Sequence, residues 1–71
     1  MFLTDEERKK IESLLKDNPT AGHQRRAEVL LLTDQGQTSR EIAARTGLKP
    51  SGVRYWRAQF RIRGWSIFGE Q

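Results

Sequence analysis

Hydrophobic side chains recur every three or four positions in several stretches of the chain, which is the spacing of amphipathic helices. The first stretch follows Thr4 and Glu7, which match a capping box, and acidic residues fill the turn where a helix dipole favours negative charge. Its apolar stripe consists of Ile11, Leu14 and Leu15. Because the residue before Pro19 is disfavoured in helical geometry, we expect this helix to end near Asp17.

A second helix is predicted from about Ala21 or His23 to Gln35, with Gly36 as a left-handed cap. Its apolar side chains cover more than one face of the cylinder: Ala27, Val29, Leu30, Leu31 and Leu32. A face this wide is expected of a central helix that touches two neighbours. We favour core packing over a self-association surface as its explanation.

The segment 38–60 has the spacing of a helix-turn-helix. Thr38 opens its first helix with a second capping box, Ala43 is small enough for close helix approach, and Gly47 permits the positive φ of a tight turn. A further helix is predicted to begin near Pro50, whose fixed φ suits a first helical turn. The inward positions of this last helix are Val53, Trp56 and Phe60.

Length and composition favour one small all-α domain. A chain of 71 residues buries only about 60% of its unfolded surface, so its stability should be marginal. There is no cysteine for a disulfide or a thiolate metal site, and the longest apolar run, Val29–Leu32, is far too short to span a bilayer. We expect a bundle of about four helices that contains the helix-turn-helix, in a cytoplasmic, nucleoid-associated protein.

Charge is distributed unevenly along the chain. The net charge is +4, yet residues 1–35 carry six basic and seven acidic side chains, whereas residues 36–71 carry seven basic and two acidic ones. The positive field therefore belongs to the carboxyl-terminal half, where it attracts a polyanion and speeds the encounter. A basic face alone is weak evidence, but its coincidence with the helix-turn-helix points to double-stranded DNA as the partner.

The candidate DNA contacts lie at the start of the third helix and on the outer face of the last one. They are Thr38, Ser39, Arg40, Lys49, Ser51, Gly52, Arg54, Tyr55, Arg57, Ala58, Gln59 and Arg61. Helix amino termini offer free N–H groups to phosphate, so the first three are expected to hold the backbone. Of the remainder, the amino-terminal members rank first for base reading and the arginines are assigned to phosphates.

Other side chains that could act in binding or catalysis have simpler explanations. Trp56 can in principle stack on a base, but it shares a face with Val53 and Phe60, and we place it in the core. His23 is the only histidine and has no partner ligands spaced near it. No phosphate loop, nucleophile arrangement or catalytic carboxylate pair is visible, so we expect no enzyme, catalytic residue, metal, cofactor, small-molecule ligand or membrane contact.

Residues 3–64 resemble a known family. The run RRAEVLLL-x-x-x-G, the segment SREIAARTGL and the last-helix pattern V-x-x-W-x-x-x-F are similar to the homeodomain-like helix-turn-helix. That domain occurs at the amino terminus of mariner-related bacterial insertion-sequence transposases and in short stand-alone prokaryotic proteins. The resemblance implies an all-α fold and sequence-specific DNA binding. Lys49 stands where members commonly have a capping Ser, and the Asp-Asp-Glu catalytic domain of a transposase is missing.

Three functions stay open at this point. The chain is a stand-alone DNA-binding transcription regulator, the DNA-binding segment or remnant of a transposase, or a protein- or polyanion-interaction module that does not read bases. We divide it into a helix-turn-helix domain, 1–64, and an apolar tail, 65–71. Trp65, Ile67 and Phe68 in this tail could fold back on the core, extend the domain or support a homodimer.

Overall fold

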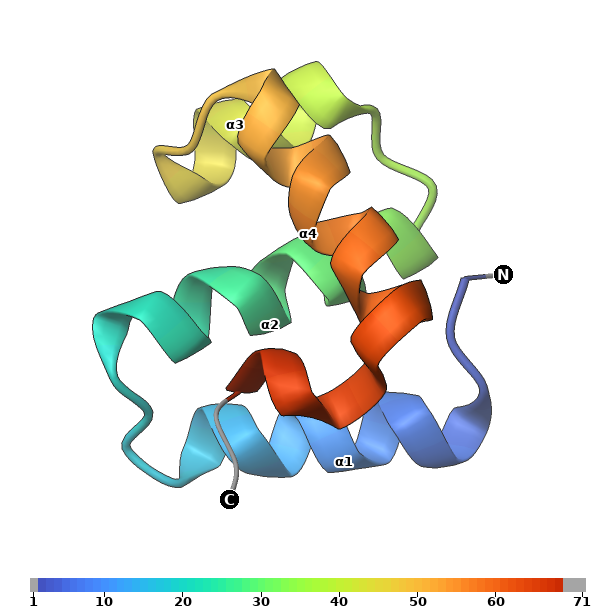
Figure 1. The fold of residues 1–71 in the computed structure, drawn as a ribbon. Coiled ribbons are helices and arrows are strands. Elements are labelled where there is room, and N and C mark those ends of the chain that lie inside the picture. The colour runs from blue at the N-terminus through green and yellow to red at the C-terminus, as the bar shows by residue number, and fades with distance from the viewer. Residues whose placement is uncertain (1, 69–71) are drawn as a thin grey trace.

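The computed structural model describes residues 2–68, and helices account for most of them (Figure 1). The elements are α1 (Asp5–Lys16), α2 (Ala21–Asp34), α3 (Ser39–Thr46), α4 (Pro50–Arg63) and the 3-10 helix η1 (Gly64–Phe68). The prediction of an all-α bundle with four α-helices is confirmed for this part of the chain, which has no strand.

Local capping explains where the helices begin and end. The Thr4 hydroxyl accepts from Glu7 N at 3.1 Å, and Thr4 N donates to Glu7 Oε1 at 2.9 Å, as the first capping box predicts. At the start of α2 the Thr20 hydroxyl accepts from His23 N at 3.2 Å, a cap that we did not anticipate. After α2, Gly36 has φ 89° and turns the chain toward α3.

The arrangement of helices makes α2 the centre of the bundle, as its wide apolar face predicts. Figure 1 shows α1 and α2 side by side and antiparallel, with α3 on the other side of α2 from α1 and α4 crossing α2. The helix α2 packs against α1, α3 and α4, while η1 packs against α4. The described chain therefore forms one bundle in which α2 supports the pair α3 and α4.

Two connected groups of buried side chains form the core. The group between α2, α3 and α4 consists of Val29, Ile42, Ala43 and Val53. The group that joins α1, α2, the end of α4 and η1 consists of Leu3, Ile11, Ala27, Leu30, Phe60 and Ile67. The first group sets the angle between α3 and α4, and the second holds the remaining elements beneath them.

Trp56 lies between the two groups and packs against both. Its indole is half-buried, with the Arg26 guanidinium carbon 4.3 Å from the ring centre and the Tyr55 ring edge-on at 5.0 Å. Neighbouring side chains therefore cover much of the ring surface outside the core. This geometry supports a packing role for Trp56 and leaves little of the ring for a base.

The segment after α4 folds back on the bundle, which is one of the arrangements that the sequence left open. Ile67 is buried in the core, and its carbonyl oxygen accepts from Arg26 Nη1 at 2.7 Å. The Trp65 ring stands edge-on to Phe60 with centroids 5.2 Å apart, and Phe68 approaches the His23 ring. Residues 69–71 of the predicted tail lie outside the described residues.

Asp34, the last residue of α2, anchors the amino-terminal segment. Its side chain is only 7% exposed, with Oδ1 accepting from Leu3 N at 2.8 Å and Oδ2 from Arg8 Nε at 3.0 Å. The Leu3 N–H donation lowers the pKa of the Asp34 carboxyl, and Arg8 adds to this effect against the opposing cost of burial. The ionised carboxylate therefore fastens Leu3 into the core.

This anchor predicts an acid-sensitive part of the folding stability. Because the pKa of Asp34 is lowered in the folded protein, its stabilisation is complete above about pH 4, the ordinary aspartate value, and is lost as the pH falls through the lowered pKa. We expect Asp34→Asn to lower the thermal midpoint at pH 7 by several degrees, with the difference from wild type shrinking as the pH falls through the lowered pKa.

The control is Asp5→Asn, because Asp5 also pairs with Arg8 but is 80% exposed and should contribute little. Thermal unfolding followed by circular dichroism between pH 7 and pH 2 makes the comparison. A constant difference between Asp34→Asn and wild type across this range would show that the carboxylate charge is not what stabilises the segment.

Candidate nucleic-acid interface

The turn between α3 and α4 is held by its own hydrogen bonds. Gly47 has φ 80°, in the left-handed region, and its N–H donates to Ala43 O at 2.9 Å. The buried Thr46 hydroxyl donates to Ile42 O at 2.8 Å and accepts from Leu48 N at 3.4 Å. These bonds tie both sides of the turn together, so α4 leaves α3 in one fixed direction.

The amino terminus of α4 has no side-chain cap. Lys49 takes the extended cap conformation, with φ −82° and ψ 153°, but makes no capping hydrogen bond, and Pro50 follows it. This agrees with the missing capping Ser noted in the sequence. Because the first N–H groups of a helix have no partner within the helix, those of Ser51 and Gly52 are available to a ligand that approaches this end.

The predicted DNA contacts all lie at the surface, and none is buried. The exposed members are Thr38, Arg40, Lys49, Ser51, Arg54, Tyr55, Ala58 and Arg61, and the half-buried ones are Ser39, Gly52, Arg57 and Gln59. The opposite face of α4 holds Val53 and Phe60 in the core. The helix therefore presents to solvent the face that the sequence assigned to DNA.

On that face the side chains form three rows, because positions three and four apart lie above one another on a helix. The row on one side is basic: Arg54, Arg57 and Arg61. The central row, directly opposite the core, is Ser51, Tyr55, Ala58 and Ile62. The row on the other side contains Gly52, Gln59 and Arg63. The row predicted to face the bases is thus flanked by a row of arginines, whose charge suits phosphate.

A hydrogen bond joins the basic row to the start of α3. Arg57 Nη2 donates to Ser39 Oγ at 2.7 Å, and both groups are predicted phosphate contacts. The Thr38 hydroxyl next to them accepts from Glu41 N at 3.2 Å, so it serves the capping box. The structure therefore brings Ser39 and Arg57 together, on the side where the α3 dipole is positive.

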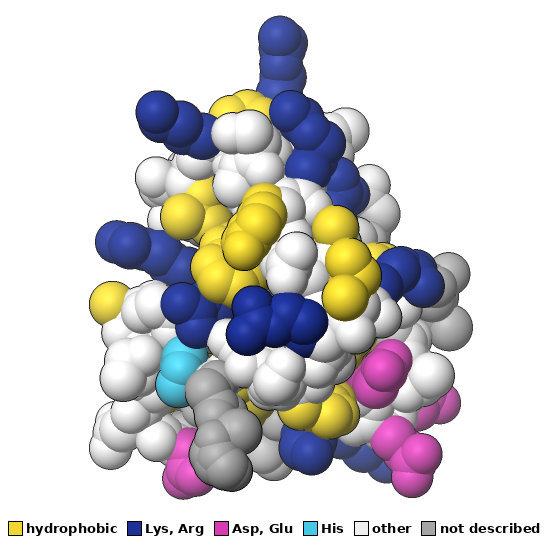
Figure 2. Space-filling view, in the orientation of Figure 1, with side chains coloured by type: hydrophobic (Ala, Val, Ile, Leu, Met, Phe, Trp, Pro, Cys, Tyr) yellow, Lys and Arg dark blue, Asp and Glu magenta, His cyan; other side chains and the backbone are white. Residues whose placement is uncertain are grey.

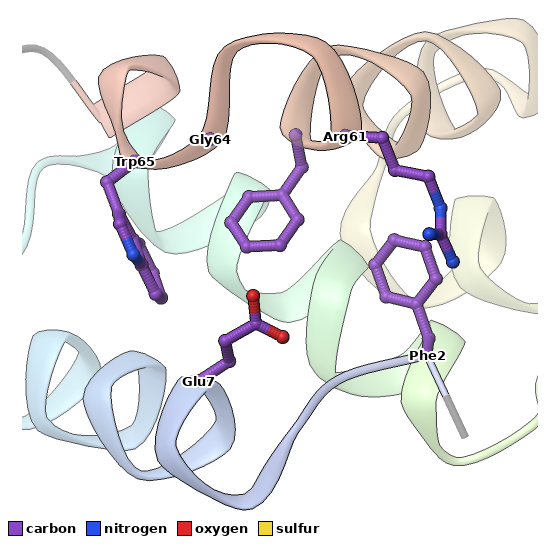
Figure 3. Close-up of a pocket in the computed structure, with 6 residues that line it drawn as sticks. Phe2, Glu7, Arg61, Gly64 and Trp65 are labelled. Atoms are coloured by element: carbon purple, nitrogen blue, oxygen red, sulfur yellow. The ribbon is translucent and has the colours of Figure 1, made fainter.

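Arg61 is placed apart from this cluster. Its guanidinium carbon lies 4.7 Å above the centre of the Phe2 ring, at the edge of an open depression of about 350 Å³ (Figure 3). Glu7 and the Phe60 and Trp65 rings also line the depression. Figure 3 shows Arg61 directed toward Phe2 and away from Trp65. Arg61 thus packs against the amino-terminal segment.

Ile62 belongs to the central row, but we did not include it in the predicted site. Ile62 is 75% exposed, and the other large apolar residue that is exposed within residues 2–68, Tyr55, is 49% exposed. The sequence contained the signal, because Ile62 lies four positions after Ala58 and seven after Tyr55, outside the inward spacing of Val53 and Phe60.

The surface charge follows the division seen in the sequence. Figure 2 shows Lys and Arg side chains projecting from the upper part of the molecule, where Figure 1 places α3 and the start of α4. On this view Asp and Glu gather in the lower part, near α1. A positive potential over α3 and α4 favours a polyanion at this end.

Within residues 2–68, no group of three or more His, Cys, Asp or Glu side chains is placed to hold a metal ion. None of the helices described is long and apolar enough to cross a membrane.

The fold and this surface define a helix-turn-helix protein. A comparison with known protein families matches residues 20–65 to the Homeodomain-like domain, and the chain belongs to that family. The predicted resemblance to a homeodomain-like helix-turn-helix is confirmed, and membership implies DNA binding. The match indicates no catalytic family. Comparisons with curated proteins and with solved structures found no match.

Gly52 offers a test of close contact at this surface. A Cβ at Gly52 would meet only Leu48 Cβ, at an ordinary 3.9 Å, so the fold does not require glycine there. We expect Gly52→Ala to keep or raise the thermal midpoint, since alanine is favoured over glycine in a helix by up to about 1 kcal/mol. We expect DNA affinity to fall about tenfold, because the methyl group obstructs the approach of the DNA backbone or a base edge. A tenfold loss of affinity corresponds to about 1.4 kcal/mol of binding free energy.

The matched control is Gly22→Ala, in the first turn of α2, where a Cβ would meet only the end of the Arg26 side chain at 3.7 Å. It should change stability in the same direction and leave DNA affinity unaltered. Titration of a labelled duplex, beside thermal unfolding, measures both quantities. Wild-type affinity in Gly52→Ala would mean that DNA does not approach this position closely.

Proposed function

We propose that this protein binds double-stranded DNA sequence-specifically, with α4 in the major groove, as a small transcription regulator. The observation that carries the proposal is the solvent face of α4, where a central row of small and apolar side chains lies beside arginines. The Arg57 to Ser39 hydrogen bond, at 2.7 Å, connects that face to the amino terminus of α3. A helix of this width fits the major groove, and phosphates flank it there.

The roles of the side chains follow from their places on α4. Lys49, Ser51, Gly52 and Tyr55 lie at the amino-terminal part, which in helix-turn-helix docking does most of the base reading. Lysine suits guanine, a hydroxyl suits several bases, and Gln59 suits adenine from the neighbouring row. Arg54 and Arg57 of the basic row, with Ser39 and Arg40, bind phosphates and fix the position of α4 along the duplex. Arg61 joins them by turning away from the Phe2 ring. No catalytic step is part of this proposal.

A transposase DNA-binding segment is the second candidate, because the sequence resembles that group of proteins. The two candidates share the same contacts with DNA. They differ in whether the domain acts alone as a transcription regulator or is joined to the catalytic domain of a transposase. The open reading frame downstream of Gln71 and the genes around it separate them.

We also propose that two copies act on one operator. A single small module with one recognition helix buries little surface, and paired modules on half-sites about 34 Å apart are the common solution. The symmetry of the bound sequence reports this stoichiometry.

The experiment that tests the function is selection of bound duplexes from a random pool, followed by titration with the selected duplex and a scrambled one. We expect the selected duplex to bind about a thousandfold more tightly at equal salt. Equal affinities for the two would instead indicate a polyanion-binding module that does not read bases. A site with two inverted or repeated half-sites supports two copies.

The phosphate assignment makes a separate prediction about salt. Arg54→Ala should weaken binding to selected and scrambled duplexes alike and reduce the slope of log affinity against log salt by about one. Arg25→Ala is the control, since Arg25 is also exposed but lies on α2, away from the proposed interface. Its slope should stay at the wild-type value. If Arg54→Ala retains the wild-type slope, or both variants lose the same amount, the basic row is not the phosphate contact.

A further inference from the structure

Ile62 is the most exposed of the large apolar side chains in the described part of the chain, at 75%. It lies in the last turn of α4, in the row directly opposite the core, so no packing role within the bundle explains it. Isolated apolar residues at a surface are ordinary. Ile62, however, lies in line with Ala58 and Tyr55 on the outer face of α4, so the proposed binding mode places it against DNA.

The surroundings of Ile62 are strongly basic. Arg61 and Arg63 precede and follow it, and Arg54 stands at the other end of the same face. A surface that only attracted phosphates would gain nothing from an isoleucine between arginines. A surface that enters the major groove meets one apolar group on the base edges, the C5 methyl of thymine.

We propose that Ala58 and Ile62 read the C5 methyl groups of thymines in the bound site, with Ile62 as a specificity-determining residue. The inference rests on the proposed function and names the base that this part of α4 selects. Burial of the methyl against Ile62 removes apolar surface of both partners from water. Cytosine, which lacks the methyl group, would leave the isoleucine facing a hydrophilic edge.

The spacing of the two residues sets the spacing of the methyl groups. Ala58 and Ile62 are four residues apart, which is about 6 Å along the helix axis. Successive bases on one strand are about 3.4 Å apart along the duplex. For a helix that lies along the groove, the two side chains thus face bases about two steps apart. The small side chain of Ala58 lets the helix backbone approach one methyl, and the longer Ile62 reaches the other.

The test replaces thymines one at a time by deoxyuridine in the selected duplex, which removes the methyl group and keeps every base-pairing group. We expect the wild-type protein to lose about fourfold in affinity at one or two thymines and nothing at the others. Ile62→Ala should bind the unmodified duplex about fourfold more weakly and be insensitive to deoxyuridine at one of those positions. Its thermal midpoint should match wild type, because the side chain is exposed.

Arg54→Ala is the control in this cycle. It should weaken binding overall while keeping the same ratio between thymine and deoxyuridine duplexes, because its contact is with phosphate. The inference is overturned if no thymine shows sensitivity, or if Ile62→Ala keeps the sensitivity of wild type. It is also overturned if Ile62→Ala alters sedimentation of the free protein while the deoxyuridine profile stays unchanged, which would assign Ile62 to self-association. Failure to select any duplex would instead remove the proposed function itself.

Discussion

The direction of α4 depends on the mutual burial of Val29, Ile42 and Val53, one side chain from each of α2, α3 and α4. All three are completely removed from solvent. Burial of an aliphatic side chain contributes about 1.5–3 kcal/mol, which is a large share of the stability of a domain this small. Once these three side chains meet, the face of α4 opposite Val53 must point outward, and the basic and apolar rows on that face follow from the same rotation.

The core group that joins α1, α2, the end of α4 and η1 holds in place the elements that take no part in the proposed DNA interface, α1 and η1. Ile67 completes this group from η1, and Leu3 completes it from the amino-terminal segment, held by Asp34. Both segments are short and could not fold alone. Their contribution is to enlarge a core that the four α-helices of a 71-residue chain would leave small. The two ends of the described chain therefore stabilise the same part of the bundle, away from α3.

Much of this arrangement could be predicted from local sequence signals, because caps and turns act over a few residues. Thr4, Thr38 and Gly47 identify helix ends through hydrogen bonds or positive φ that involve near neighbours. The Asp34 anchor and the Arg57 to Ser39 bond join residues 31 and 18 positions apart, and no local pattern indicates them. Ile62 is a different case, because its spacing from Ala58 and Tyr55 already placed it on the outer face of α4, and the predicted site stopped at Arg61.

The outer face of α4 and the start of α3 form the proposed contact surface for DNA. Amide chemical shifts of the isotopically labelled protein, measured with and without the selected duplex, test this residue by residue. We predict that the largest changes fall within residues 38–40 and 49–62, while those of α1 and η1 stay small. If the largest changes lie on α1 or η1 and the amides of α4 are unaffected, the proposed interface is wrong.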